Sequence, residues 1–420
     1  MTGLRFCMLT TFYPPYNFGG DGIGIQRLSR ALVRRGHQVT VVHDIDAFNL
    51  LHRGPEPETP DADDGVVVRG LRSGAGALSP LLTQQFGRPV LNGARIRGLI
   101  RDGRFDVVQF NNVSLIGGPG VLRMGRGAVT LYEAHEHWLV CPTHVLWRHG
   151  REACPERQCL RCTLHHRRPP QLWRYTGALH RQLQHVDAFI AKSEFSRSKH
   201  REFGFPRDME VIPYFLPDIG GNERAPAPAP HPRPYFLFVG RLERIKGLDD
   251  VIPLFRAYEG ADLLIAGTGE HEAALRRQAQ GLPRVHFLGR VAQDRLADYY
   301  RHAVALIVPS RCFETFGIIL IEAFRHGTPV LARRIGPFPE IVTRADGGML
   351  FDTAKDLLGC MRLLQEEPAV RHRHATSGRR AFPELWSESA VVPEYLSLVA
   401  RLAETKQGSR TEIPREETGS

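Results

Sequence analysis

The stretch "ETFGIILIEAFRHGTPV" (314–330) contains two glutamates with seven residues between them, and the second lies inside an apolar run. Burying a carboxylate is strongly destabilising unless a partner pairs with it or hydrogen-bonds to it. Glu314 follows the strand-like run "ALIVPS" (305–310), and a helix is predicted to begin near Phe316 or Gly317. The unpaired backbone amides at a helix start suit an anion, and a phosphate in particular. Glu314 would then lie beside that anion.

The second glutamate, Glu322, lies four residues after Ile318 and three after Ile319, and so shares part of their helical face. Hydroxyl groups of a ligand would satisfy its oxygens there. The alternative is that Glu322 pairs with Arg325 or His326 one turn later, and that the first glutamate is only an acidic residue at a helix start. Such an exposed pair contributes roughly a few tenths of a kcal/mol. The elements around the motif must decide between the two.

The first half of the chain alternates strand and helix signals. The run "LRFCMLTTF" (4–12) is strand-like, and a glycine loop, "NFGGDGIG" (17–24), leads from it into an amphipathic helix, "IQRLSRALVRRG" (25–36). This alternation predicts parallel strands in an open α/β sheet. Further strands are predicted at 37–44, 65–71, 106–112, 128–134 and 188–193.

A proline-rich stretch, "PDIGGNERAPAPAPHPRP" (217–234), interrupts this pattern and is predicted to link two domains. The alternation restarts after it, so the second half predicts another sheet of the same kind. Strands are predicted at 235–243, 261–270, 285–289, 305–310 and 329–333, and helices at 246–258, 271–280, 294–303 and 315–327.

Two doubly wound, Rossmann-like sheets facing each other across a cleft would bind a ligand at the carboxyl ends of their strands. The long helical pattern near the end of the chain would pack back on the first domain. The predicted organisation is an N-terminal domain over 1–216, the linker over 217–234, a C-terminal domain over 235–378, a helix over 379–404 and a disordered tail over 405–420.

The order of these motifs resembles that of the GT-B glycosyltransferases of family 4. The resemblance covers roughly residues 4 to 345. It implies two Rossmann-like domains and a retaining transferase that moves a sugar from a nucleoside diphosphate sugar to a hydroxyl acceptor. The segments that carry it are "YPPYNFGGDGIG", "LSRALVRRGHQVTVVH", "FVGRLERIKGLDDVI", "LIAGTGE", "VHFLGRV", "ALIVPS" and the glutamate motif.

In the resembled family the first glutamate of this E-x7-E motif contacts the donor sugar and the second contacts the nucleotide ribose, which implies these roles for Glu314 and Glu322. Arg241 and Lys246 correspond in position to the family's diphosphate-binding pair. Fixed cations at these positions would stabilise the charge that develops on a leaving diphosphate. The alternative is that both are surface charges after a strand. The nucleotide-binding backbone is expected at Gly20, Gly240, Gly267, Gly269, Phe316, Gly317 and Ile318.

The segment "AHEHWLVCP" (134–142) resembles an "HDxWxxCP" segment in a subset of the family, in which the histidine faces the donor sugar. The resemblance implies a catalytic role for His135, with His137 as the other candidate. A structural histidine at a strand end is the alternative. Asp21, in the glycine loop, receives no role. In the family that loop lies against the donor phosphate or the acceptor, and a simple turn is the alternative.

The resemblance also implies how the reaction proceeds. Transfer would occur on one face of the sugar, with a leaving phosphate oxygen helping to deprotonate the acceptor hydroxyl. The active site would rely on cations and helix amides and require no metal cofactor. The donor base and sugar stay open, and the acceptor is expected to be a glycan or a lipid-linked precursor.

Four of the seven cysteines, Cys141, Cys154, Cys159 and Cys162, lie close together in the sequence. Four thiolates can hold zinc tetrahedrally, and the last two have the C-x2-C spacing of a zinc knuckle. The alternatives are reduced thiols, an iron–sulfur cluster or a disulfide, although cytosolic thiols are usually reduced. The candidate structural zinc site falls in an insert at about 138–170, which would help to shape the acceptor pocket. Nearby substitute ligands are His144, His165 and His166.

The formal net charge of +10 and the pI near 9.5 fit a solvated surface, or attraction to an anionic lipid or substrate. No nucleic-acid-binding motif accompanies the charge, so no nucleic-acid partner is expected. No apolar run is long enough for a membrane span, and the first residues read as a strand rather than a signal peptide. These features predict a cytoplasmic protein, with peripheral membrane contact left open. Rival functions are a glycoside hydrolase, a phosphorylase, or a non-enzymatic, zinc-containing anion-binding protein.

Overall fold

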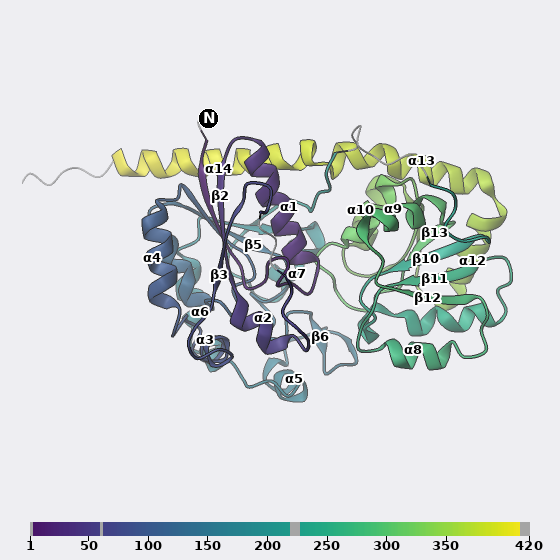
Figure 1. Ribbon diagram of the computed structural model, residues 1–420, viewed down its shortest axis with the longest axis horizontal. Coiled ribbons are helices and arrows are strands. Elements are labelled where there is room, and N and C mark those ends of the chain that lie inside the picture. The colour runs from purple at the N-terminus through teal and green to yellow at the C-terminus, as the bar shows by residue number, and fades with distance from the viewer. Residues whose placement is uncertain (1–2, 59–61, 219–226, 412–420) are drawn as a thin grey trace, which may run out of the picture.

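The computed structural model describes residues 3–58, 62–218 and 227–411, which form two α/β lobes lying side by side (Figure 1). The first lobe is built on a parallel sheet of order β3-β2-β1-β4-β5-β8-β9. Its strands are β1 (Arg5–Leu9), β2 (Gln38–Asp44), β3 (Val67–Leu71), β4 (Val107–Phe110), β5 (Val129–Ala134), β8 (Ala188–Ala191) and β9 (Met209–Val211).

Successive strand residues point to opposite sides of this sheet, so apolar strands present a face on each side. Helices cover both faces. Phe6 and Met8 of β1 enter one apolar core, and Cys7 and Leu9 enter the other. The helical segments are α1 (Gly20–Arg34), α2 (Ile45–Leu51), α3 (Leu78–Phe86), α4 (Gly93–Gly103), η1 (Pro119–Gly125), α5 (Cys159–His165), η2 (Leu172–Tyr175), α6 (Ala178–Leu183) and α7 (Glu194–Glu202), and a short hairpin pairs β6 (Trp147–Arg148) with β7 (Glu152–Ala153).

The second lobe repeats the plan with a parallel sheet of order β12-β11-β10-β13-β14-β15. Its strands are β10 (Tyr235–Val239), β11 (Asp262–Ala266), β12 (Val285–Gly289), β13 (Ala305–Val308), β14 (Val330–Arg333) and β15 (Gly348–Phe351). Its helices are α8 (Glu272–Gln278), α9 (Gln293–His302), α10 (Ile318–Arg325), α11 (Phe338–Ala345), α12 (Ala354–Glu366) and α13 (Pro368–Leu385). The sequence interpretation assigned no elements between 338 and 378. The single helix predicted over 379–404 is divided between α13 and α14 (Glu388–Thr411), because Trp386 leaves the helical conformation with φ −141° and Ser387 pairs with Leu216.

Three other sequence predictions need correction. The glycine loop over 17–24 is largely helical, since α1 already begins at Gly20. The helix predicted over 246–258 is instead a series of 3-10 turns, because Gly247 adopts a left-handed φ of 77° and Pro253 interrupts the pattern. The turns are η3 (Arg244–Lys246), η4 (Leu248–Asp250) and η5 (Ile252–Arg256). The first part of the predicted tail is helical, since α14 (Glu388–Thr411) extends beyond 404, and the tail after 411 lies outside the described residues.

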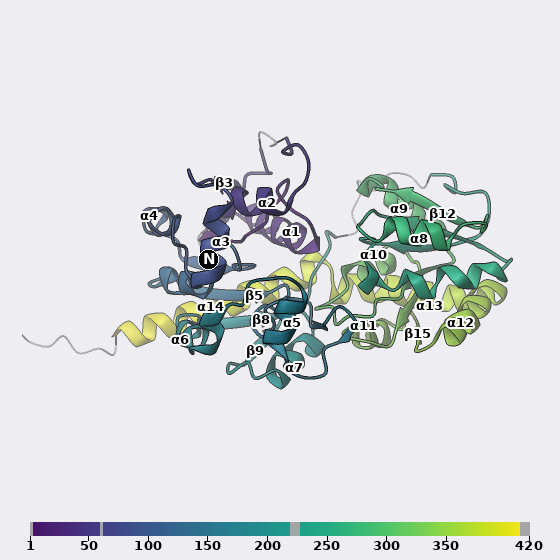
Figure 2. The ribbon, with the colours of Figure 1, turned by 90° about the horizontal axis from the view of Figure 1, so that it is seen from below.

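The last helix, α14, runs from the second lobe along the first, as the lengthwise view shows (Figure 2). Val392 and Tyr395 of α14 pack into the first-lobe core, and Tyr395 Oη donates a hydrogen bond to Gln109 Oε1 at 2.6 Å. The chain therefore crosses between the lobes twice. The two crossings are bonded to each other, because Leu216 N donates to Trp386 O at 2.9 Å and Ser389 N donates to Asp218 Oδ1 at 3.0 Å.

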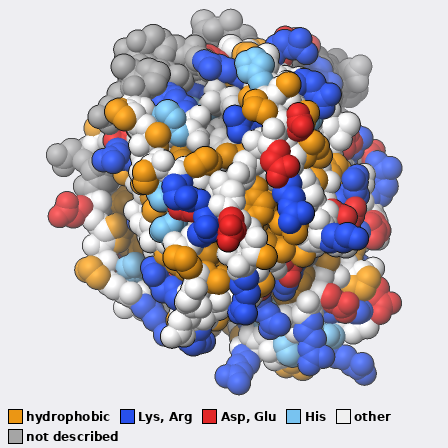
Figure 3. Space-filling view, turned by 90° about the vertical axis from the view of Figure 1, so that its right-hand side faces the viewer, with side chains coloured by type: hydrophobic (Ala, Val, Ile, Leu, Met, Phe, Trp, Pro, Cys, Tyr) orange, Lys and Arg blue, Asp and Glu red, His pale blue; other side chains and the backbone are white. Residues whose placement is uncertain are grey.

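Neither the described helices nor the charged side chains seen in Figure 3 indicate a membrane-spanning segment or a large patch of one charge. Within the described ranges, no helix is both long enough and apolar enough to cross a bilayer. Figure 3 shows basic and acidic side chains interspersed over the end of the second lobe. On this face, the net positive charge is spread among opposite charges rather than gathered.

Candidate active site between the two lobes

Glu314 and Lys246 form an ion pair beyond the carboxyl ends of two second-lobe strands, β13 and β10. Glu314 Oε1 lies 2.8 Å from Lys246 Nζ and accepts a hydrogen bond from Ser310 Oγ at 2.7 Å. Burial disfavours both charges, but the attraction between them prevails: the pKa of Lys246 is raised and the pKa of Glu314 is lowered. Two predicted site residues, distant in sequence, thus meet in the fold.

Arg241 lies close to this pair but does not bond to it. Its side chain is 56% exposed, and Arg241 Nη1 lies 2.7 Å from Glu243 Oε1. Its charge nevertheless acts on both members, opposing the raised pKa of Lys246 and helping to lower the pKa of Glu314. The second predicted cation is therefore near the site and would have to leave Glu243 to grip a ligand.

The predicted nucleotide-side glycines permit a close approach of two backbone loops. A Cβ added to Gly267 would lie 1.9 Å from Gly240 O, and one added to Gly269 would lie 2.4 Å from Leu242 O. Gly240 and Gly267 also have positive φ angles, of 155° and 144°. Larger residues would force the loops after β10 and β11 apart, so these glycines set the shape of the strand ends.

Helix α10 begins at Ile318, slightly later than predicted, with Gly317 as its N-cap. Gly317 has a φ of 103°, and a Cβ there would lie 2.7 Å from Phe338 Cε1. No side chain caps this helix start, so its first amides stay available to a ligand. Phe316 is buried and packs edge-to-face on Tyr214, with 5.8 Å between ring centres.

Glu322 has partners that the sequence did not indicate. Tyr300 Oη donates a hydrogen bond to Glu322 Oε2 at 3.1 Å, and Arg27 Nη2, on α1 of the other lobe, lies 3.6 Å from Glu322 Oε1. Burial raises the pKa of Glu322 despite these partners, and burial likewise lowers the pKa of Arg27. Within the described residues, Arg27 Nη1 is buried and has no hydrogen-bond partner.

His135 lies at the lobe boundary, after β5. Its Nδ1 lies 2.6 Å from Tyr214 Oη and its Nε2 lies 3.1 Å from Asn111 Oδ1. Thr315, next to Glu314, donates from Oγ1 to the His135 main-chain oxygen at 2.9 Å. Burial lowers the pKa of His135, although the carboxylate of Glu133 opposes the shift.

The other candidate, His137, belongs to the core. Burial lowers the pKa of His137 to about 3, and its ring packs 5.3 Å from that of His200 on α7. Among the described residues neither ring nitrogen of His137 has a hydrogen-bond partner. The polar partners of the His135 ring at the lobe boundary therefore favour His135 over His137 as the site residue.

Gly20 is the first residue of α1, and a Cβ added there would meet open space.

The sequence interpretation missed the residues that complete the first-lobe side. Glu133 forms a buried ion pair with Lys192, and Lys192 Nζ lies over the Tyr214 ring at 4.8 Å. A Cβ on Gly24 of α1 would lie 2.5 Å from that tyrosine ring. The available signal was position, because Asn111, Lys192 and Tyr214 each follow a strand of this sheet, where ligands of such folds bind.

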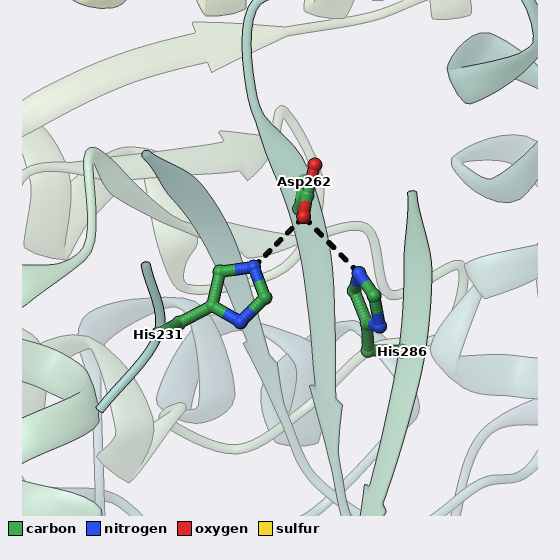
Figure 4. A group of neighbouring side chains, drawn as sticks. All are labelled: His231, Asp262 and His286. Atoms are coloured by element: carbon green, nitrogen blue, oxygen red, sulfur yellow. Dashed lines mark hydrogen bonds and ion pairs between the residues drawn. The ribbon is translucent and has the colours of Figure 1, made fainter. Parts of the chain in front are cut away.

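The four clustered cysteines are free thiols and lie outside this site, around one cavity in the insert. Another cluster lies at the amino-terminal end of β11, away from the carboxyl ends that carry the site. His231 Nε2 and His286 Nε2 lie 2.7 and 3.1 Å from Asp262 Oδ2 (Figure 4), and Arg233 Nε donates to Oδ1 at 3.0 Å. Because both imidazoles present the same nitrogen to one oxygen, this is a hydrogen-bond network that ties the residues before β10 to the sheet.

Comparisons with known proteins agree with this architecture. The glycosyl transferases group 1 family model matches residues 221–381, and the Glycosyltransferase Family 4 model matches residues 18–218. A glycogen synthase of Mycobacterium tuberculosis is 27% identical over 450 residues, covering 98% of this chain and 97% of the relative.

Solved structures share the fold. Sucrose-phosphate synthase from Thermosynechococcus elongatus superposes with a TM-score of 0.69 at 20% identity, covering 96% of this chain and 100% of that chain. Anabaena Alr3699/HepE, in complex with UDP and glucose, gives a TM-score of 0.65 at 15% identity, covering 95% and 100%. With both halves matched by their family models, the chain belongs to the GT-B glycosyltransferases of family 4.

Proposed function

We propose that the protein transfers a sugar from a nucleoside diphosphate sugar to a hydroxyl group, with retention of anomeric configuration. The observation that carries the proposal is the ion pair of Lys246, at the end of η3, with Glu314, in the loop that leads to α10. Gly317, the N-cap of α10, has no side chain to occupy the first amides of the helix. A lysine and free helix amides offer positive charge to a diphosphate. Glu314 is an acceptor for hydroxyls of the transferred sugar, as the resemblance to the family implies.

The nucleotide would enter between the lobes at Glu322. The 3.6 Å gap between Arg27 and Glu322 is longer than a hydrogen bond, so a ribose hydroxyl can take the place of this contact. Arg27 Nη1, which is unpartnered within the described residues, can donate to an oxygen of the same ligand. Tyr300 would keep Glu322 in position from the other side.

The chemical step rests on charge rather than on a protein nucleophile. Lys246, Arg241 and the α10 amides stabilise the diphosphate as the glycosidic bond breaks, and a phosphate oxygen takes the acceptor proton on the same face. His135, kept neutral by burial, is proposed to contact the donor sugar once Tyr214 gives way. No metal is required in this scheme.

A thermal-shift panel of UDP, GDP, ADP and dTDP, followed by the matching nucleotide sugars, tests the proposal. Glu322→Gln should abolish the nucleotide shift, and Glu314→Gln should mainly lower turnover. Lys355→Gln, an exposed change on α12, is the control and should alter neither. NMR of the product should show the anomeric configuration of the donor. Incubation with nucleotide sugars that yields neither a transferred sugar nor free nucleoside diphosphate would reject transfer and favour a hydrolase or phosphorylase.

The acceptor is proposed to be a glycan or lipid-linked precursor at the cytoplasmic face of a membrane. The first lobe exposes apolar side chains on α3, α5 and η2, with Phe86 at 57%, Leu164 at 57% and Leu172 at 68%. Trp173 Nε1 donates to Gln84 O at 2.8 Å, which holds η2 against α3. Exposed arginines accompany α5, so both apolar contact and positive charge are available to an anionic lipid surface.

Co-sedimentation with phosphatidylcholine vesicles, with and without phosphatidylglycerol, tests this surface. Binding should require the anionic lipid and weaken with salt. The double variant Leu164→Glu/Leu172→Glu should lose it, whereas Leu363→Glu on α12 should not. Binding by the double variant equal to that of the parent would reject this surface and leave the transfer reaction untouched.

A further inference from the structure

The four clustered cysteines converge in the fold. Cys141 follows β5, Cys154 follows the β6–β7 hairpin, and Cys159 and Cys162 belong to α5, yet all four line one cavity of about 320 Å³ that is open to solvent. The other walls are mainly apolar, including Val140, Leu146, Trp147 and Phe203. The four thiols therefore form a three-dimensional cluster, although their spacing in the sequence matches no common zinc ribbon.

The segment around this cavity has little regular structure to hold it. Between β5 and α6 it contains only the two-residue strands β6 and β7, the short helix α5 and the turn η2. Leu146, which is 2% exposed, adopts a left-handed φ of 47°, which is unusual for a leucine. An irregular segment of this kind commonly needs a cross-link or a metal to define one conformation.

A partly buried cation, Arg174, lies near the thiols. The guanidinium of Arg174 stacks over the rings of Trp138 and Trp173, at 5.1 and 4.7 Å from their centres. Arg174 Nε donates to the Gln171 side chain at 2.5 Å, but Nη2 is buried and has no hydrogen-bond partner among the described residues. The Arg174 charge interacts electrostatically with Cys141 and Cys159, two of the four clustered cysteines.

A partly buried charge with an unpartnered, buried Nη2 atom is stabilised by negative charge nearby. Neutral thiols do not supply it, whereas thiolates do. We propose that Cys141, Cys154, Cys159 and Cys162 bind one Zn²⁺ ion as thiolates, with Arg174 as the counter-charge beside it. Binding releases four protons and leaves a metal–sulfur group with two negative charges, one of which Arg174 balances.

Two contacts of the sulfurs fit this arrangement, whereas the thiols of Cys154 and Cys162 donate to Glu156 O and Trp147 O at 3.1 and 3.8 Å and would lose those bonds on forming thiolates. His149 N donates to Cys162 Sγ at 3.5 Å, and Thr143 Oγ1 lies 3.3 Å from Cys141 Sγ. Donors of this kind around metal-bound thiolates orient them and tune the metal. Both contacts can persist after the thiols lose their protons, because in each the sulfur can act as the acceptor.

Metal binding would contract the cavity. Within the described ranges, the only group of three or more candidate ligand atoms that all lie within 4.8 Å of one another is His231, Asp262 and His286. No three of the four sulfurs therefore lie within 4.8 Å of one another, whereas all four would lie about 3.8 Å apart in a zinc tetrathiolate with Zn–S bonds of about 2.3 Å. The open mouth and the short elements around the cavity leave the loop free to close.

Metal analysis of the purified full-length chain is the first test. About one zinc per chain is expected, released by a thiol-modifying mercurial. Replacement by Co²⁺ should give thiolate-to-cobalt charge transfer and the visible bands of a tetrahedral site. Zinc well below one per chain, together with no cobalt spectrum, overturns the proposal. Iron–sulfur absorption, or thiols that appear only after reduction, would overturn it as well.

Variants separate the cluster from the other cysteines. Cys159→Ser should lose the stoichiometric zinc, whereas Cys360→Ser, on α12 of the second lobe, should keep it. Arg174→Met should keep the tetrahedral cobalt spectrum but bind the metal about 10- to 100-fold more weakly in competition with a chelator. If Cys159→Ser does not fold, the cobalt spectrum of the parent chain still decides. An Arg174→Met affinity equal to that of the parent would reject the counter-charge role.

Discussion

Each lobe carries a lysine–glutamate pair near the carboxyl ends of its strands, but the two pairs differ in burial. Lys192 and Glu133 are only 4% and 5% exposed, whereas Lys246 and Glu314 are 22% and 18% exposed. The first pair is enclosed by protein groups, among them Gln109 and the ring of Tyr214. The second lies in loops, within reach of a ligand. The comparison suggests that the first pair holds the lobe boundary together and that the second binds substrate.

The first prediction concerns stability and is the largest effect expected. Glu133→Gln removes one partner of the fully buried pair and leaves the Lys192 charge uncompensated, which should cost about 3–5 kcal/mol in the free energy of unfolding. Glu314→Gln should cost less, because its lysine is partly exposed to water. Urea unfolding of both variants provides the measurement. Equal losses would remove the distinction between the two pairs.

The second prediction concerns activity. Lys246→Met should lower kcat about 100- to 1,000-fold, because it removes a fixed cation that opposes charge in the transition state. Steady-state kinetics with the donor identified by the thermal-shift panel would measure this, with Lys355→Met as the matched control. A Lys246→Met enzyme within a few-fold of the parent would mean that the second pair is structural as well.

Acid should weaken the first lobe before the second. Burial lowers the pKa of His43 to about 4, of His137 to about 3 and of His200 to about 4, and all three lie in the first lobe. The unfolded chain therefore takes up protons first, and stability falls as the pH drops below about 6.5, by up to about 1.4 kcal/mol per pH unit for each histidine. Asp44, with its pKa raised to about 7 by burial, offsets one of them.

Hydrogen exchange at pH 7 and pH 5 measures this difference. Protection of β2 and β5 should fall more than protection of β10 and β11. A uniform loss across both sheets would show that the buried histidines do not set the acid response of the first lobe.

The smallest effect is expected at Tyr300, which supports Glu322 through one hydrogen bond. Tyr300→Phe should weaken nucleotide binding about fivefold, the equivalent of about 1 kcal/mol for a single hydrogen bond. Calorimetric titration with the preferred nucleotide measures it. Unchanged affinity would mean that Arg27 alone fixes the position of Glu322.

The comparison also explains what the sequence could reveal. The second-lobe site is concentrated in two short motifs, so the resemblance to the family could point to Lys246, Glu314 and the glycines at the strand ends. The first-lobe side is assembled from Asn111, Glu133 and Lys192, which lie far apart in the chain and carry no local signature. Their meeting depends on strand order, which periodicity alone does not give.

Local chemistry explains the errors in secondary structure. Gly20, Gly22 and Gly24 were assigned to a loop, but tertiary contacts fold them into α1, where Gly24 leaves room for Tyr214. The apolar pattern after Lys246 is helical in period, yet Gly247 and Pro253 restrict it to 3-10 turns. The fold class was readable from the alternation of elements, and the family and structure comparisons confirm it.

The two bonded crossings between the lobes restrict how the molecule can open. Leu216 is hydrogen-bonded to Trp386 and Asp218 to Ser389, so the two segments that connect the lobes are joined to each other. We expect the lobes to rotate about this joined connection rather than move on two independent segments. Swinging about that axis changes the spacing least beside it and most at the far rim. Rotation about that axis would widen the far rim without sliding one lobe past the other.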